Sequence, residues 1–296
     1  MTSRDATVPM SANTTGALLM MASMAAFTVN DVLIKLTDGA VPLGQMLFLR
    51  GLVSVLLILI LARWLGRISF DIAARDWGRI GLRCVAEVGA AYFFITALLN
   101  MPIANATAIL QALPLTVAVG AWLVLGEPLG WRRMVAIGIG FVGMLLIVQP
   151  GAEGFTIWSL YALATVLCVT VRDLATRGLS VGVPTMTVTL SAALAVTTSF
   201  GVMSMTEPWV PMTPRLALLI GGAAVLIIAA YWFSVRVMRV GEIGFVAPFR
   251  YTGLVFALIL GWLVFGDWPD ALVLLGAGIV VAMGIFTLYR ERLSRG

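Results

Sequence analysis

Apolar segments of about 20 residues, separated by short polar breaks, occupy almost the whole of this 296-residue chain. A bilayer core about 30 Å thick needs about 20 mostly apolar residues for each helical crossing. The composition agrees, because 61% of the residues are hydrophobic, 11% are charged, and the mean hydropathy is +1.04. These observations predict an all-α membrane protein and leave no room for a soluble domain.

The polar breaks divide the chain into ten expected transmembrane helices. Pro42, Pro184 and Pro214 each stand at or near a first helical position, where the missing amide hydrogen costs nothing. The ten expected spans are 14–35, 42–62, 78–99, 103–125, 132–149, 155–176, 184–205, 215–237, 243–265 and 271–289.

The distribution of arginine and lysine predicts the orientation of these spans, because positively charged loops stay on the cytoplasmic side. With the N-terminus inside, the cytoplasmic segments hold fifteen of the nineteen basic residues. Outside segments keep only Lys35 and Arg215, and Arg50 and Arg250 lie within spans. We therefore expect both termini in the cytoplasm and a multi-pass protein of the bacterial cytoplasmic (inner) membrane.

A repeat with a constant offset of about 140 residues relates the two halves of the chain. "AWLVLGEPLGWRR" (121–133) matches "GWLVFGDWPD" (261–270), and Gly138 matches Gly278. Farther upstream, "VNDVLIKL" pairs with "VRDLATRGL", and Val41-Pro42 pairs with Val183-Pro184. Because five helices, an odd number, separate the copies, the second copy crosses the membrane in the opposite sense.

A 5+5 inverted-topology repeat is the architecture of many secondary transporters, which bind substrate between two related halves. Receptors and intramembrane enzymes have no physical need for it. We divide the chain into a cytoplasmic N-terminal tail at 1–13, a first five-helix repeat at 14–150, a second, inverted repeat at 151–289, and a cytoplasmic C-terminal tail at 290–296.

The sequence resembles the EamA type of the drug/metabolite transporter superfamily over nearly its whole length. The resemblance is carried by Ala97-Leu98, Pro114, the segment 122–127, Gly138 with Gly143, and Arg50 in "FLRGL", while Leu254 stands where the first half has Pro114. It implies a ten-helix fold with a central substrate cavity. Within the superfamily the chain looks most like the bacterial amino-acid exporters of the YddG type.

Several other functions are disfavoured by the residues present. The absence of histidine removes imidazole-based catalysis and the commonest metal ligand, so we expect no metal, no cofactor and no enzyme activity. Cys84 and Cys168 both lie in apolar spans as expected reduced thiols. "GIGFVG" (138–143) fits a dinucleotide motif but lies inside a span, where glycines permit close helix contact. The only lysine, Lys35, does not belong to a Walker A motif, and the scattered basic residues do not indicate nucleic-acid binding.

Charged residues inside the spans are candidate functional residues, because each costs about 2.5–3.5 kcal/mol to insert. Glu87 is expected near the membrane midplane, either as an ammonium or proton site or as a neutralising partner of Arg83. Arg50 and Arg250 are expected at similar depth, where a guanidinium can hold a carboxylate, form a structural ion pair or snorkel to the interface.

The remaining candidates are repeat-related polar and aromatic residues. Asp31 with Lys35, and Asp173 with Arg177, are expected to form salt bridges near opposite membrane faces, with gating roles as the alternative. Gln111 and Tyr251 correspond under the offset, and both are expected to face the substrate. The aromatic residues of the third and eighth spans, Tyr92, Phe93, Trp232 and Phe233, line the cavity or serve packing and interface roles.

These observations favour a secondary active or facilitative transporter that exports neutral or aromatic amino acids, or related metabolites, by alternating access. The alternatives are transport of another solute (a vitamin, a nucleobase or an adenosyl compound) and, from other classes, a membrane sensor or intramembrane enzyme. The expected partners are a small-molecule substrate and the bilayer, with proton coupling through Glu87 as a hypothesis and a monomer or homodimer as the assembly.

The antiparallel arrangement predicts that the matching loops of the two repeats emerge on opposite sides of the membrane. Cysteine placed at Arg133 or at Trp268, in a chain with Cys84 and Cys168 replaced by serine, tests this. In intact cells an impermeant maleimide should label W268C alone, and R133C only after permeabilisation. Labelling of both variants from one side would contradict the inverted repeat.

Overall fold

The computed structural model describes residues 12–65, 68–126, 130–149, 156–180, 182–240 and 246–295. Eight of its helical segments are long and apolar enough to span a membrane, and two shorter apolar helices, Met134–Val148 and Ala271–Phe286, bring the number within the described residues to the expected ten. The chain is therefore an all-α protein with ten membrane-spanning segments.

The first repeat contains six helices, because one expected span is broken. These are α1 (Ala12–Lys35), α2 (Leu43–Leu65), α3 (Ala74–Asn100), α4 (Ile103–Leu110), α5 (Leu113–Leu125) and α6 (Trp131–Val148). The break between α4 and α5 follows from Pro114, which has no amide hydrogen for the carbonyl of Leu110 and whose ring crowds that carbonyl.

The second repeat contains α7 (Ile157–Arg177), α8 (Thr185–Ser204), α9 (Pro214–Val240), the 3-10 helix η1 (Ala247–Tyr251), α11 (Thr252–Leu260), the π-helical turn η2 (Gly261–Phe265) and α12 (Ala271–Arg295). The backbone of the expected ninth span is irregular at the position equivalent to the break between α4 and α5 in the fourth span. Gln111 follows α4, and its repeat equivalent Tyr251 ends η1. Irregular backbone at membrane depth is tolerated where it borders a cavity. The first residues expected in this span, 243–245, lie outside the described part.

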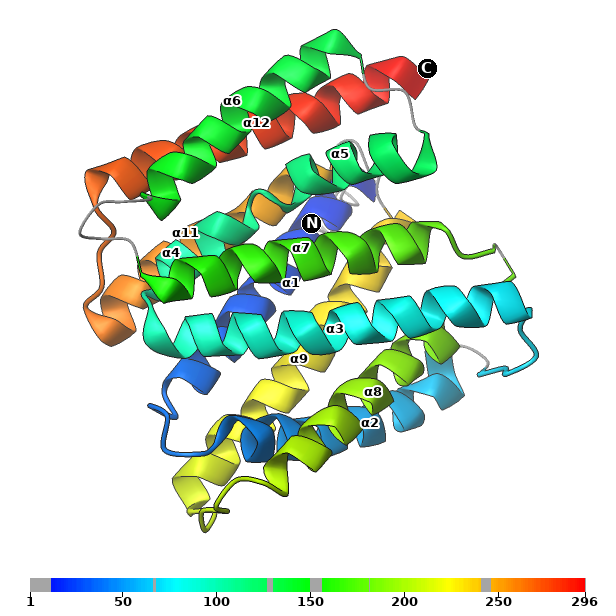
Figure 1. Cartoon of the computed structure of the whole chain (residues 1–296), viewed down its shortest axis with the longest axis vertical. Helices are drawn as coiled ribbons and strands as arrows, with labels where there is room; N and C mark the ends of the chain where they lie inside the picture. Colours follow the sequence, from blue (N-terminus) through cyan, green and yellow to red (C-terminus); the bar gives the residue numbers. More distant parts are fainter. Residues whose placement is uncertain are drawn as a thin grey trace, which may run out of the picture.

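Helices of one repeat pack against helices of the other. The main pairs are α1 with α9, α3 with α7, α2 with α8, and α6 with α12. Figure 1 shows α6 and α12 together at one edge of the molecule, α2 and α8 at the opposite edge, and the remaining helices between them. This pattern is unchanged when each helix is exchanged for its repeat equivalent, as a two-fold related pair of bundles requires.

Two equivalent polar clamps tie the ends of the α2–α8 pair. Gln45 Nε2 donates to the carbonyl of Val210, and Val210 N donates to Gln45 Oε1, at 2.8 and 2.9 Å. Thr187, the repeat equivalent of Gln45, accepts from Ser69 N at 3.0 Å and donates to Ser69 O at 2.9 Å. The clamps join opposite ends of the two helices, so α2 and α8 run antiparallel, as inverted copies must.

The glycines of the fifth and tenth spans permit close contact between α6 and α12. A Cβ added at Gly143 would lie 2.9 Å from the carbonyl oxygen of Gly276, and a Cβ at Gly276 would lie 2.5 Å from the carbonyl oxygen of Gly143. These two helices therefore pack directly on each other. Gly126 and Gly266, which end equivalent helices, both have positive φ (68° and 72°), as left-handed C-terminal caps favour.

The replacement Gly143→Ala should destabilise the protein by about 1–3 kcal/mol, because the added methyl forces two backbones apart. Gly138→Ala in the same helix is the matched control, since nothing lies within 4 Å of its added Cβ. Thermal unfolding in detergent should show a clearly lower Tm for G143A and an equal or higher Tm for G138A. Equal values for both variants would show that the α6–α12 contact does not limit stability.

Candidate functional site

A central cavity of about 430 Å³ lies between the two repeats. Its walls come from α1, α2, α3, α4, α5, α7, α9, η1 and α11, so both broken spans border it. The lining reaches Arg177, an exposed residue at the C-terminal end of α7, and the cavity is accessible from that end. A volume in this range is typical of small-molecule sites.

At the opposite end, the cavity lining stops short of a half-buried cation, Lys35, which lies one turn beyond Asp31 on α1. Lys35 Nζ, at the C-terminal end of α1, donates to the carbonyls of Leu98 and Met101 at 3.0 and 2.8 Å. The same ammonium lies 5.5 Å from the centre of the Phe265 ring. Lys35 therefore joins α1 to the end of α3 and to η2 of the other repeat, instead of forming the expected salt bridge with Asp31.

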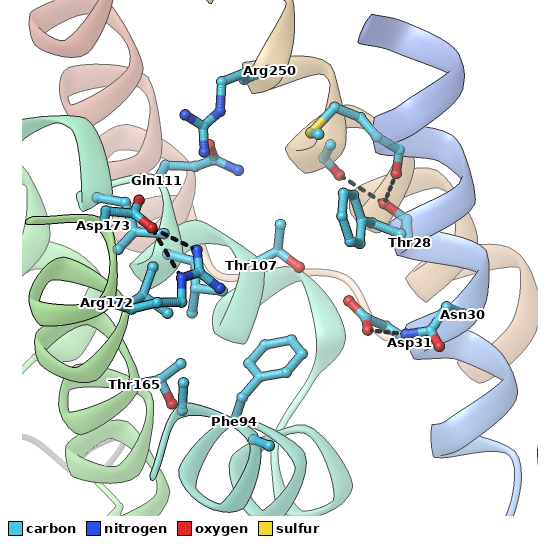
Figure 2. Close-up of a pocket in the computed structure, with 18 of the residues that line it drawn as sticks. Thr28, Asn30, Asp31, Phe94, Thr107, Gln111, Thr165, Arg172, Asp173 and Arg250 are labelled. Carbon is cyan, nitrogen blue, oxygen red and sulfur yellow. Dashed lines mark hydrogen bonds and ion pairs between the residues drawn. The ribbon is translucent and has the colours of Figure 1, made fainter. Parts of the chain in front are cut away.

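One wall of the cavity carries a free guanidinium. Arg250 of η1 extends toward Gln111, at the break between α4 and α5 (Figure 2). Within the described part of the chain, Arg250 has neither an ion pair nor a hydrogen bond through its side chain. Gln111 and its repeat equivalent Tyr251 line the cavity with Arg250, and the expectation that both face the substrate stays a prediction.

Arg172 and Asp173 of α7 form a second polar group on the cavity wall. Arg172 Nε and Nη2 both lie 2.9 Å from Asp173 Oδ1. Arg172 Nη1 also reaches Glu87 Oε1 of α3 at 3.3 Å. The guanidinium therefore neutralises two acids at once, one of which lines the cavity.

Across the cavity, α1 presents Asn30 and Asp31 (Figure 2). Asn30 Nδ2 donates to Asp31 Oδ1 at 2.8 Å, and the side chain of Asn30 is buried with its Oδ1 unpartnered in the described part of the chain. Arg50 of α2 lines the same cavity, but no ion pair within 4.0 Å joins it to Asp31. Thr28, one turn earlier on α1, donates to the carbonyls of Met24 and Gly253.

Glu87 lies behind the cavity wall instead of facing the cavity. Its carboxylate lies 3.5 Å from Arg83 Nη1, one turn earlier on α3, and 3.3 Å from Arg172. Of the two roles that the sequence leaves open, the neutralisation of arginine agrees with these contacts. Arg172 was missed as its partner, because the two residues are 85 positions apart.

The aromatic candidates Tyr92 and Trp232 do not line this cavity. Tyr92 packs against Phe93 and Tyr161, with ring centres 5.4 and 6.2 Å apart. Trp232 lies under Arg236, whose guanidinium carbon is 4.9 Å from the ring centre. Packing, the alternative that the sequence offered for these aromatics, describes both contacts. The aromatic side chains that line the cavity are Phe27, Phe94, Tyr231 and Tyr251.

Three of the four charges expected near opposite membrane faces, Asp31, Asp173 and Arg177, line one cavity, whereas Lys35 does not. Arg50, expected within a span, lines the same cavity. Asn30, Thr107, Thr165 and Arg172 also line it, although the sequence analysis singled out none of them. The offset of 142 that pairs Val41 with Val183 also pairs Asn30-Asp31 with Arg172-Asp173, and this signal identifies two of the missed residues.

Comparisons with known proteins agree with this architecture. Residues 14–149 match the model of the EamA-like transporter family. The chain is 26% identical to a riboflavin transporter of Vibrio cholerae over 95% of both chains, and 23% identical to an S-adenosylmethionine uptake transporter of Rickettsia prowazekii over 94% of both. A pseudopaline exporter of Pseudomonas aeruginosa is 27% identical over 94% of this chain and 96% of its own length.

A solved crystal structure shares the fold. It matches with a TM-score of 0.63 at 18% sequence identity, over 95% of this chain and 99% of its own. None of the three relatives above is named as an amino-acid exporter of the YddG type. The expectation of amino-acid export is therefore less well supported than its alternative, another small metabolite such as a vitamin or an adenosyl compound.

The ion pairs of Glu87 predict the behaviour of Glu87→Gln. The change leaves Arg83 and Arg172 without one counter-charge, and a charged hydrogen bond is worth about 1.5–3 kcal/mol, so the unfolding free energy should fall by about 2 kcal/mol. Asp270→Asn, at an exposed acid, is the control. A proton carrier should instead lose the pH dependence of transport on this change, and retention of that dependence in E87Q would exclude Glu87 from the role.

Proposed function

We propose that this protein, whose residues 14–149 match the model of the EamA-like transporter family, binds an anionic group of its substrate at Arg250 and carries the substrate through the central cavity by alternating access. The chain is a multi-pass protein of the inner membrane and a transporter of small metabolites, not an enzyme. We infer the class of substrate and the residues that bind it from the size and lining of the cavity.

The unpartnered guanidinium of Arg250 is the observation that carries this proposal. A charge at membrane depth is costly and is normally paired or solvated in a cavity. Arg172, by contrast, is neutralised by Glu87 and Asp173. A planar guanidinium binds a carboxylate or phosphate through two parallel hydrogen bonds, and the nearby amide of Gln111 supplies a further donor.

The size and lining of the cavity favour a substrate with an apolar or aromatic body. Phe27, Phe94 and Tyr231 contribute ring surface, and the volume of about 430 Å³ is enough for one metabolite of moderate size. Among the compounds that relatives are named for, S-adenosylmethionine combines a purine with a carboxylate, whereas riboflavin carries no anionic group. We therefore infer an adenosyl or comparable carboxylate-bearing metabolite as the substrate, with amino acids as the class to be tested against it.

Alternating access follows from the two repeats, 14–150 and 151–289, which enclose the cavity from opposite directions. The cavity is accessible at the Arg177 end and stops short of Lys35 at the other end. With the termini in the cytoplasm, the accessible end faces inward. The cavity is compatible with secondary active transport and with facilitated diffusion, because neither mode requires a nucleotide-binding motif.

Counterflow in proteoliposomes tests this function. Vesicles loaded with unlabelled S-adenosylmethionine should accumulate the labelled compound saturably, and Arg250→Ala should raise KM about tenfold or more, since a charged hydrogen bond contributes about 1.5–3 kcal/mol. Arg250→Lys should retain part of the affinity. Arg215→Ala, outside the cavity, is the control and should leave KM unchanged.

Parallel vesicles loaded with riboflavin or with a mixture of amino acids identify the substrate class. Exchange of amino acids alone would restore amino-acid transport as the function. Absence of exchange for all three, from a protein that elutes as a single species, would contradict a transport function in this cavity.

A further inference from the structure

Each repeat places an aspartate-containing dipeptide on the cavity wall, and the two dipeptides lie on opposite walls. They share the aspartate but differ in the residue before it, which is neutral in one repeat and basic in the other. Asn30-Asp31 on α1 and Arg172-Asp173 on α7 are equivalent by an offset of 142. In each, the first side chain donates to Oδ1 of the aspartate that follows, at 2.8 Å from Asn30 Nδ2 and at 2.9 Å from Arg172 Nε. The local geometry is therefore conserved between the repeats, and the charge is not.

That difference decides the net charge of each pair. The guanidinium of Arg172 neutralises Asp173, and its remaining nitrogen reaches Glu87. The amide of Asn30 carries no charge, so Asp31 receives no counter-charge within its pair. Arg50 is the basic group that interacts electrostatically with Asp31, but no ion pair within 4.0 Å joins the two side chains, and Lys35 binds the carbonyls of Leu98 and Met101 instead.

The free oxygen of Asp31 is available to a ligand. Oδ1 accepts from Asn30, and Oδ2 has no hydrogen-bond partner in the described part of the chain. Figure 2 shows the Asp31 carboxylate directed into the cavity, on the wall opposite Arg172 and Asp173. Beside it, Asn30 is only 1% exposed, and its Nδ2 holds the Asp31 carboxylate in this position.

We infer that Asn30 and Asp31 form a binding site for a cationic group of the substrate, an ammonium or a sulfonium. The inference rests on the proposed function and extends it, because an anion site at Arg250 and a cation site at Asp31 on different walls of one cavity select a zwitterionic metabolite. The two cavity walls then have different roles. On α7, Arg172 and Asp173 form an internal ion pair, and on α1, Asn30 and Asp31 bind the cationic group of the substrate.

Competition in the S-adenosylmethionine counterflow assay tests this site. S-Adenosylhomocysteine keeps the ammonium group but lacks the sulfonium charge, and 5′-methylthioadenosine lacks the whole amino-acid portion and carries no charge. In the wild type, S-adenosylmethionine should compete much better than 5′-methylthioadenosine. In Asp31→Asn this preference should fall about tenfold, the size expected for one charge-assisted hydrogen bond.

Two variants control for the fold and for charge. Asp31→Asn keeps an acceptor for Asn30, and Asp31→Glu keeps the charge and should retain most of the preference. Asp270→Asn removes an exposed acid outside the cavity and should leave the ratio of the two inhibition constants unchanged. All variants are compared as single species by size-exclusion chromatography.

The competitors also identify which cation is bound. If D31N weakens S-adenosylmethionine and S-adenosylhomocysteine alike, the ammonium occupies the site, and if it weakens S-adenosylmethionine alone, the sulfonium does. A D31N variant with the wild-type preference, or one that weakens uncharged 5′-methylthioadenosine equally, would overturn the cation site while leaving transport intact. Wild-type vesicles that exchange riboflavin but not S-adenosylmethionine would overturn it too, and vesicles that exchange nothing would instead contradict the proposed function.

Discussion

The cost of placing a charge in hydrocarbon separates the structural residues of this protein from those available to a substrate. Glu87, Arg83, Arg172 and Asp173 neutralise one another across α3 and α7, and so hold two helices of different repeats together. Lys35 is satisfied by carbonyls at the end of α3. Once these groups are paired, Arg250, Arg50 and Asp31 remain as cavity-lining charges without an ion pair in the described part of the chain. The proposed site offers Arg250 and Asp31 to a substrate with complementary charges.

The inverted repeat explains why such a cavity exists, and its imperfections explain why the cavity is selective. Identical halves would present identical walls, and an asymmetric metabolite would then gain little from one orientation over the other. Here Pro114 breaks the fourth span, whereas Leu254 stands at its equivalent and the irregularity shifts to η1, which carries Arg250 into the cavity. The replacement of Asn30 by Arg172 in the second copy likewise makes the two walls differ, because the Arg172–Asp173 pair contains its own counter-charge and the Asn30–Asp31 pair does not.

The sequence was sufficient to predict the number and the approximate ends of the spans, because hydropathy depends on no distant contact. The break after Leu110 was not predicted, since the fourth span was expected to run unbroken over 103–125 despite Pro114. The partner of Glu87 was not predictable in this way, because Arg172 approaches only through the packing of α3 on α7. The sequence also did not predict that Tyr92 and Trp232 point away from the cavity, because spans that are apolar on all sides give little indication of which face turns inward. Gln111, Arg250 and Tyr251 line the cavity at the points where the backbone departs from a regular helix, and their role in substrate binding stays a prediction.

The contacts at the two ends of the cavity show what a change of access requires. At one end, Lys35 fastens α1 to the carbonyls at the end of α3, and the Gln45 clamp fastens α2 to the loop between α8 and α9. At the accessible end, Thr187 forms the equivalent clamp, so this contact is already made on both sides. The clamps are therefore the same at both ends. The two ends differ at Lys35 and its repeat equivalent Arg177, because Lys35 binds backbone carbonyls and Arg177 lines the cavity. Opening the Lys35 end means separating Lys35 from two buried carbonyls, and a bound zwitterion that draws α1 toward the opposite wall through Asp31 acts on the same helix.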